Sequence, residues 1–226
     1  MKHRNSHLMV GYWSRLRKGR DVPDQTDIDP RQIKRMLASI FILEASDPAR
    51  PVYRLAGTTL CDRFGFELKG TNFLSHWEAQ SRGALVTSLR QSLSSRQPIC
   101  ISSIASTSEC GAAELETILA PVSFGTGGAT RFIGIVQVLS DPTPLAGRPI
   151  AFERLVSCQM IREDEPLSTF SAPPPPMPPL EPIRSHPRAP HLRLVVSRDK
   201  PAAVHMDTMM QDLIAMLGIR GGPALA

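Results

Sequence analysis

The sequence has few aromatic residues and no long apolar run. Aromatic side chains make up 5% of the 226 residues, although 42% of the chain is hydrophobic. No apolar run approaches the roughly 20 residues that a membrane-spanning helix needs. Near the basic N-terminus the longest apolar run is Leu8-Met9-Val10, which is shorter than the core of a secretory signal. We therefore expect a cytoplasmic protein without a transmembrane segment, with one ordinary domain plus appendages.

Residues that carry redox, metal or catalytic chemistry are sparse. The four cysteines, Cys61, Cys100, Cys110 and Cys158, show no Cys-x-x-Cys spacing, so we expect reduced thiols rather than disulfides or a zinc site. Five of the six histidines lie towards the chain ends, and His76 is the one inside the expected domain. Because no catalytic constellation is present, we predict neither a metal site nor an enzyme.

Acidic residues are absent from the first 20 positions, which hold six basic residues. Residues 21–171 carry 14 basic and 17 acidic residues, and the segment from 172 to 200 is basic again. A protein that recognises nucleic acid usually concentrates positive charge on its folded domain. We therefore expect no specific nucleic-acid binding, while a looser contact of residues 1–20 with an acidic surface remains open.

An amphipathic helix is predicted at about His7–Lys18. Its apolar side chains recur at three- and four-residue spacing: Leu8, Met9, Tyr12, Trp13 and Leu16. The stripe either packs onto the domain or forms a dimer or partner contact. A membrane-surface helix fits less well because the stripe is short.

The remaining pattern is α+β. Strands are predicted at about 39–44, 52–56, 99–106, 114–123 and 130–139. Asp29-Pro30 predicts the start of a short helix, and the capping box Ser75-His76-Trp77-Glu78 predicts the start of the longest helix. The apolar face of that longest helix would carry Trp77, Leu85, Leu89 and Leu93.

Several of these segments share features with one known family. The strand Val52–Ala56 is followed by Gly57, and a short helical segment then carries Glu67 three residues before Gly70. With Tyr12-Trp13, Gly19-Arg20 and Asp27-Ile28-Asp29-Pro30 upstream, residues 5–160 resemble a family of bacterial single-domain PAS proteins. The resemblance implies a PAS fold, in which a five-stranded antiparallel sheet carries helices on one face, with an N-terminal helix before it.

The resemblance also implies a ligand pocket between sheet and helices. We expect it to be lined by Phe64, Phe66, Phe73, Trp77, Ile133 and Ile135, which would suit a small apolar or flat ligand. The sequence identifies no cofactor. Arg54 and Glu67 are expected to point towards one site and to pair.

Two further residues have a functional and a structural interpretation. Haem-binding PAS domains use a helix histidine, which makes His76 a candidate ligand, but a place in the first helical turn predicts that His76 faces solvent. Cys61 lies in a segment that faintly resembles the cysteine motif of light-sensing PAS domains, and a buried structural thiol is the simpler expectation.

The C-terminal part has a different composition. Nine of the residues 171–190 are proline, which predicts a stiff linker. We expect an N-terminal basic amphipathic helix at 1–20, a PAS domain at 21–165, the Pro-rich linker at 166–190, and a strand and Met-rich helix at 191–226. That last helix would either fold back on the domain or contact another chain.

Together these features predict a cytoplasmic sensory or regulatory protein without catalytic activity. It would signal through binding of a ligand or partner, as a homodimer that acts on an unidentified signalling protein. The alternative is a ligand-free adaptor that acts through its terminal helices.

Overall fold

The computed structural model describes residues 1–109, 111–125 and 128–162. The predicted Pro-rich linker and the C-terminal strand and helix lie outside these residues. Within the described part of the chain, no helix is long and apolar enough to cross a membrane.

The first helix, α1, spans Arg4–Leu16 and so begins three residues before its predicted start. Its early start has a local cause: His3 accepts a hydrogen bond from the Asn5 N–H, and the buried Glu116 carboxylate of the sheet accepts from the N–H groups of Lys2 and His3. These bonds supply acceptors for N–H groups that a helix start leaves without partners.

The apolar stripe of α1 packs onto the sheet. Met9, Tyr12 and Trp13 are buried, and the Trp13 indole N–H donates to the Pro121 carbonyl oxygen at 2.7 Å. Leu8, by contrast, is 49% exposed. The structure therefore realises the first of the two predicted uses of this stripe.

Three 3-10 turns, Gln25–Asp27, Pro30–Ile33 and Leu37–Ser39, connect α1 to the sheet. The expected helix at Pro30 is only the second of these turns. Strands β1 (Ile40–Glu44) and β2 (Val52–Ala56) form the predicted antiparallel pair.

Helix α2 (Thr58–Phe64) follows directly from Gly57. A Cβ atom at residue 57 would lie 2.3 Å from the Ala38 carbonyl oxygen, so this close approach of two backbone segments requires glycine.

The longest helix, α3, spans Ala79–Ser95, and the predicted capping box at its start is wrong. Glu78 is the N-cap residue and makes no side-chain capping bond, and residues 75–77 precede the helix. The Arg82 guanidinium instead donates to the carbonyl oxygens of Ser75 and Trp77 and holds this segment against the first turn.

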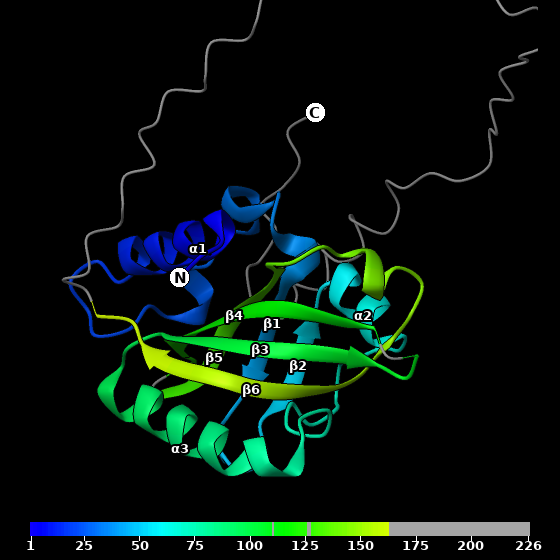
Figure 1. Ribbon diagram of the computed structural model, residues 1–226. Helices are drawn as coiled ribbons and strands as arrows, with labels where there is room; N and C mark the ends of the chain where they lie inside the picture. The colour runs from blue at the N-terminus through cyan, green and yellow to red at the C-terminus, as the bar shows by residue number, and fades with distance from the viewer. Residues whose placement is uncertain (110, 126–127, 163–226) are drawn as a thin grey trace, which may run out of the picture.

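Four strands complete the sheet: β3 (Ile99–Thr107), β4 (Ala112–Ser123), β5 (Ala129–Val138) and β6 (Ile150–Met160). The first three match the prediction, and β6 was not predicted. All neighbours are antiparallel in the order β2-β1-β5-β4-β3-β6. The five expected strands are therefore joined by a sixth, which pairs with β3 (Figure 1).

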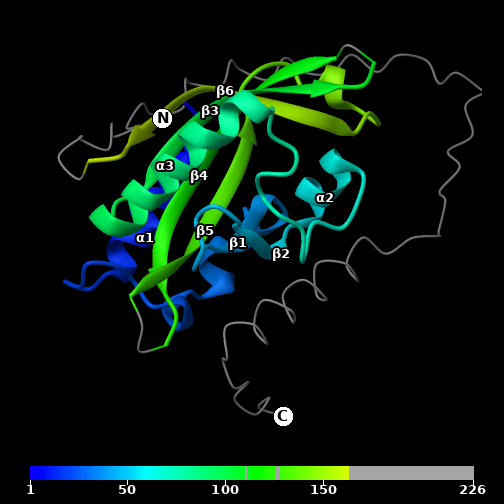
Figure 2. The same ribbon diagram turned by 90° about the horizontal axis from the view of Figure 1, so that it is seen from below.

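The sheet has an apolar layer on both faces. One layer packs against α2 and α3, and the other packs against α1 and the 3-10 turns. Figures 1 and 2 show α1 and α3 on opposite sides of the strands. The fold is thus α+β, with α2 and α3 on one face as predicted and α1 on the other.

Candidate functional site

Three of the six predicted lining residues meet on the α2/α3 face of the sheet. Phe64, Phe73 and Trp77 are each less than 5% exposed and belong to one apolar cluster. Phe66 is 50% exposed, although its ring still touches that of Phe64 edge-on at 6.4 Å. Since Gly65 ends α2 with a φ of 77°, the chain turns outward there and takes Phe66 with it.

The other two predicted lining residues face the opposite side. Ile133 and Ile135 pack in the layer under α1, whereas Phe132 and Val136 of the same strand face α2 and α3. Successive strand residues point to alternate faces, so no pocket can be lined by both sets. The predicted pocket therefore combined residues from the two sides of the sheet.

His76 lies at the centre of the aromatic cluster on the α2/α3 face. Its ring centroid is 4.4 Å from that of Phe64, 5.7 Å from Phe73, 6.1 Å from Tyr53 and 6.3 Å from Trp77. With 7% exposure it does not face solvent, and that prediction is wrong. Because residue 76 precedes α3 rather than forming its first turn, the side chain is directed into the core.

A second buried ionisable group faces His76 from β6. The His76 Nε2 atom lies 3.8 Å from Glu153 Oε1 and 3.5 Å from the Tyr53 hydroxyl oxygen. The Ser103 hydroxyl donates to Glu153 Oε2 at 2.7 Å. We call these four residues, all less than 9% exposed, the His76 cluster. Sequence reasoning missed Glu153 because it missed β6.

Burial disfavours the charged form of both ionisable partners. Burial raises the pKa of Glu153 to about 7, and the hydrogen bond from Ser103 offsets this increase only in part. It lowers the pKa of His76 to about 3, and the nearby Arg82 charge acts in the same direction. Burial, followed by the Glu153 charge, also raises the pKa of Tyr53. We infer that near neutral pH His76 is uncharged and that Glu153 is protonated in about half of the molecules.

The His76 cluster also joins two segments of backbone. The Glu153 N–H donates to the His76 carbonyl oxygen at 2.8 Å, and the Glu78 N–H donates to the Glu153 carbonyl oxygen at 2.9 Å. Two buried nitrogens beside these bonds, His76 Nδ1 and Trp77 Nε1, have no hydrogen-bond partner among the described residues. Both nitrogens could still bind a polar group.

The described residues contain no group of three or more His, Cys, Asp or Glu side chains that could hold a metal ion. The Cys61 sulfur lies 3.6 Å from a Glu67 carboxylate oxygen. Burial and this carboxylate raise the pKa of the Cys61 thiol, which keeps it protonated and unreactive at neutral pH.

Arg54 and Glu67 have other partners than each other. Arg54 Nε lies 3.7 Å from a Glu44 carboxylate oxygen, and Glu67 accepts a hydrogen bond from the Lys69 N–H at 3.1 Å. Arg131 approaches the same Glu44 oxygen at 2.8 Å. Arg54 is thus half-exposed and belongs, with Glu44 and Arg131, to an ion-pair group at the end of β1.

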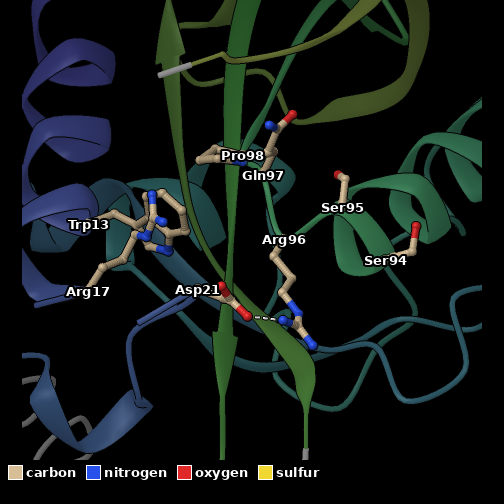
Figure 3. A pocket seen from close by; sticks show the side chains of 8 residues that line it. All are labelled: Trp13, Arg17, Asp21, Ser94, Ser95, Arg96, Gln97 and Pro98. Atoms are coloured by element: carbon tan, nitrogen blue, oxygen red, sulfur yellow. Dashed lines mark hydrogen bonds and ion pairs between the residues drawn. The ribbon is translucent and has the colours of Figure 1, made fainter. Parts of the chain in front are cut away.

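A surface hollow of about 270 Å³ lies between α1 and the end of α3. Figure 3 shows Arg96 pointing across it to Asp21, with which it forms an ion pair, and Arg17 lying over the Trp13 ring at 5.3 Å from the ring centroid. The cations of this hollow are therefore already engaged by groups of the chain itself.

Comparison with known proteins gives the family. A family model described as PAS domain matches residues 1–137, which is more than half of the chain, and the chain belongs to this family. The family assigns it a sensory or regulatory role in signalling. No match was found among curated proteins.

The solved structures to which this chain is similar include light-oxygen-voltage domains. One, studied with a flavin analogue, is 13% identical, with 51% of this chain and 87% of that chain covered and a TM-score of 0.40. The Rhodobacter sphaeroides LOV protein is 14% identical, with 50% and 69% covered and a TM-score of 0.38. An RNA-binding LOV receptor is 16% identical, with 52% and 34% covered and a TM-score of 0.39. At these scores, no ligand or activity is transferred to this chain.

Proposed function

We propose that this protein is a PAS regulatory module that signals by binding a partner protein, without catalysis and with a core filled by its own side chains. The observation that carries the proposal is the position of His76. Four aromatic rings surround its ring at 4.4 to 6.3 Å between centroids, on the face of the sheet where a PAS ligand would sit.

Side chains of the strands beneath this cluster also pack closely in the core. The Phe41 ring lies so close to Gly134 that a Cβ atom there would be 2.3 Å from a ring atom. Phe41 also packs edge-on against Tyr53 and stacks with Phe73, at 5.5 and 6.3 Å between centroids. Such close contacts leave little room for a ligand in this part of the core, so we place the binding surface of the module on its outside.

A ligand sensor is the second candidate, because of His76 Nδ1 and Trp77 Nε1. Both nitrogens are buried and without a partner in the described structure. A small molecule with a hydrogen-bond acceptor that separates the rings would satisfy them, since unpaired buried polar groups carry an energetic cost. This candidate places the ligand beside Phe64, Phe73 and Trp77 and requires a more polar ligand than the sequence suggested.

Native mass spectrometry of the full-length chain tests the proposal. We expect the mass of the polypeptide alone, or of an integral multiple of it. A retained mass that disappears in the variant His76→Phe, which fills the same space without a polar atom, would establish the ligand sensor instead. The same spectra test the predicted homodimer. The homodimer, the cytoplasmic location and the bacterial origin all stay predictions.

A further inference from the structure

A second surface hollow of about 270 Å³ lies beside the first turns of α1. Residues 4, 5 and 8 of α1 form one side, and residues 31–36, which include the last three residues of the second 3-10 turn, form the other. Figure 1 shows α1 and the short blue turns that follow it lying side by side on one face of the sheet. We call this hollow the α1 groove.

The α1 groove carries four cations and no acid among its lining residues. Arg4, Arg31, Lys34 and Arg35 are exposed, and none forms an ion pair with another described residue. The carboxylate of Asp29, at the start of the 3-10 turn, is occupied as an acceptor from the Arg31 N–H and the Gln32 side chain. Among the described residues, no ion pair therefore balances the positive charge of the groove, unlike that of Arg96 in the other hollow.

An apolar contact point lies among these cations. Leu8 is 49% exposed and lines the groove, with the buried Ile33 and Met36 opposite it in the lining. Exposure of one leucine is common on protein surfaces, but its place inside a groove edged by four cations gives the site a mixed apolar and cationic character.

We propose that the α1 groove binds an acidic, amphipathic peptide segment of the signalling partner, an inference that rests on the proposed function. Carboxylates of the segment would face Arg4, Arg31, Lys34 and Arg35, and an apolar side chain would cover Leu8. Complementary charges of this kind raise the association rate and fix orientation, while apolar anchors add affinity. Single-stranded nucleic acid fits less well, because its bases stack on aromatic side chains and none lines the groove.

Fluorescence anisotropy with the full-length chain tests this site. The probe is a labelled synthetic peptide of about 14 residues, rich in Glu and with Leu at helical spacing. We expect the double variant Lys34→Gln/Arg35→Gln to weaken binding about tenfold, since each exposed charge pair contributes little by itself. The matched control, Arg50→Gln/Arg90→Gln, removes two exposed cations elsewhere and should change the affinity less than about twofold.

Two further comparisons locate the contact. Leu8→Gln should weaken binding of the Leu-containing peptide but not of a version in which Gln replaces each Leu. Methyl NMR signals of Leu8, Ile33 and Met36 should shift on titration with the peptide. Equal weakening by the groove variant and its control, or shifts confined to other methyl groups, would overturn the proposal.

Parallel titrations use a single-stranded oligonucleotide and vesicles of anionic lipid. Tighter binding of either probe than of the peptide, lost in Lys34→Gln/Arg35→Gln, would also overturn the acidic-peptide assignment. Failure of the groove is distinguishable from failure of the proposed function. A ligand mass in the native spectrum would refute the ligand-free module, whether or not the peptide binds. Unchanged peptide binding in the groove variant would refute only the proposed site.

Discussion

Glu153→Gln should make the protein more stable at neutral and alkaline pH. The buried Glu153 carboxyl has its pKa raised to about 7, against 4.5 when it is free of the fold. The folded state therefore holds the proton more tightly than the unfolded state. Below about pH 4.5, Glu153 is protonated in both states and does not destabilise the fold. Above that pH the destabilisation grows until the pH passes about 7. Glutamine does not ionise, and its amide oxygen can still accept from Ser103.

The size of the effect follows from the two pKa values. Their difference corresponds to at most about 3 kcal/mol. Between about pH 5.5 and about pH 8, the stability of Glu153→Gln relative to wild type should rise by about 2 kcal/mol. His76 acts in the opposite sense, because its lowered pKa destabilises the fold as the pH falls below 6.5. In the wild type the two slopes should cancel to within about 1 kcal/mol over this range.

Urea unfolding followed by tryptophan fluorescence, at several pH values within that window, measures this difference on the full-length chain. Burial alone would raise the pKa values of Asp24, Glu44 and Glu116, but hydrogen bonds and nearby cations outweigh it and lower them. Their contribution to the stability of the fold is therefore lost only at lower pH. The control, Glu67→Gln, removes an exposed carboxylate, and its effect should stay within about 0.5 kcal/mol at every pH.

The opposite sign would refute the reasoning. A protonated His76 paired with an ionised Glu153 is the competing state of the same two side chains, whose nearest atoms are 3.8 Å apart. In that state Glu153→Gln would leave a buried cation without its partner and lower the stability near neutral pH by about 3 kcal/mol or more. If Glu153→Gln is less stable than wild type at pH 7 to 8, His76 and Glu153 form an ion pair in the folded protein.

Four other substitutions test the packing. Gly134→Ala should destabilise the fold by about 1 to 3 kcal/mol in urea unfolding, because its methyl group would overlap the Phe41 ring. Trp13→Phe should cost about 1 to 3 kcal/mol, since it removes an indole N–H that donates at 2.7 Å to a β4 carbonyl oxygen, and amide exchange in α1 should accelerate. Phe64→Ala should cost about 3 to 5 kcal/mol but Phe66→Ala less than about 1, and equal costs would contradict their different burial.

The sequence predicted those elements that have a regular period or a clear end. Strands β1 to β5 show alternation or apolar runs between turn residues, and all five were found close to their predicted bounds. Strand β6 was missed because its pairing with β3 contains two irregularities, at Ser102/Ser103 and Ser106/Thr107. These shifts break the two-residue period of the strand, and the run 150–160 therefore lacks the alternation that identifies a strand.

The candidate site could be predicted only in part, for two physical reasons. Strand β5 is apolar on both sides, since helices cover both faces of the sheet. Its pattern could therefore not show that Ile133 lies on the opposite face from Phe64. The sequence around His76 fits a helix start, but this segment is not helical. It is held instead by Asn72, which accepts a hydrogen bond from the Leu74 N–H, and by backbone hydrogen bonds to Glu153. A single sequence does not display such long-range partners.

The packing of α1 limits where a partner can bind. Met9, Tyr12 and Trp13 form the apolar stripe that could have served a dimer, and all three are at most 3% exposed against the sheet. A partner that used this stripe would first have to detach α1, at the cost of the Trp13 hydrogen bond and of the anchoring by Glu116. Leu8 and the cations beside it require no such rearrangement. Partner binding at α1 should therefore leave the helix docked, and amide exchange in α1 should slow rather than accelerate when the acidic peptide binds.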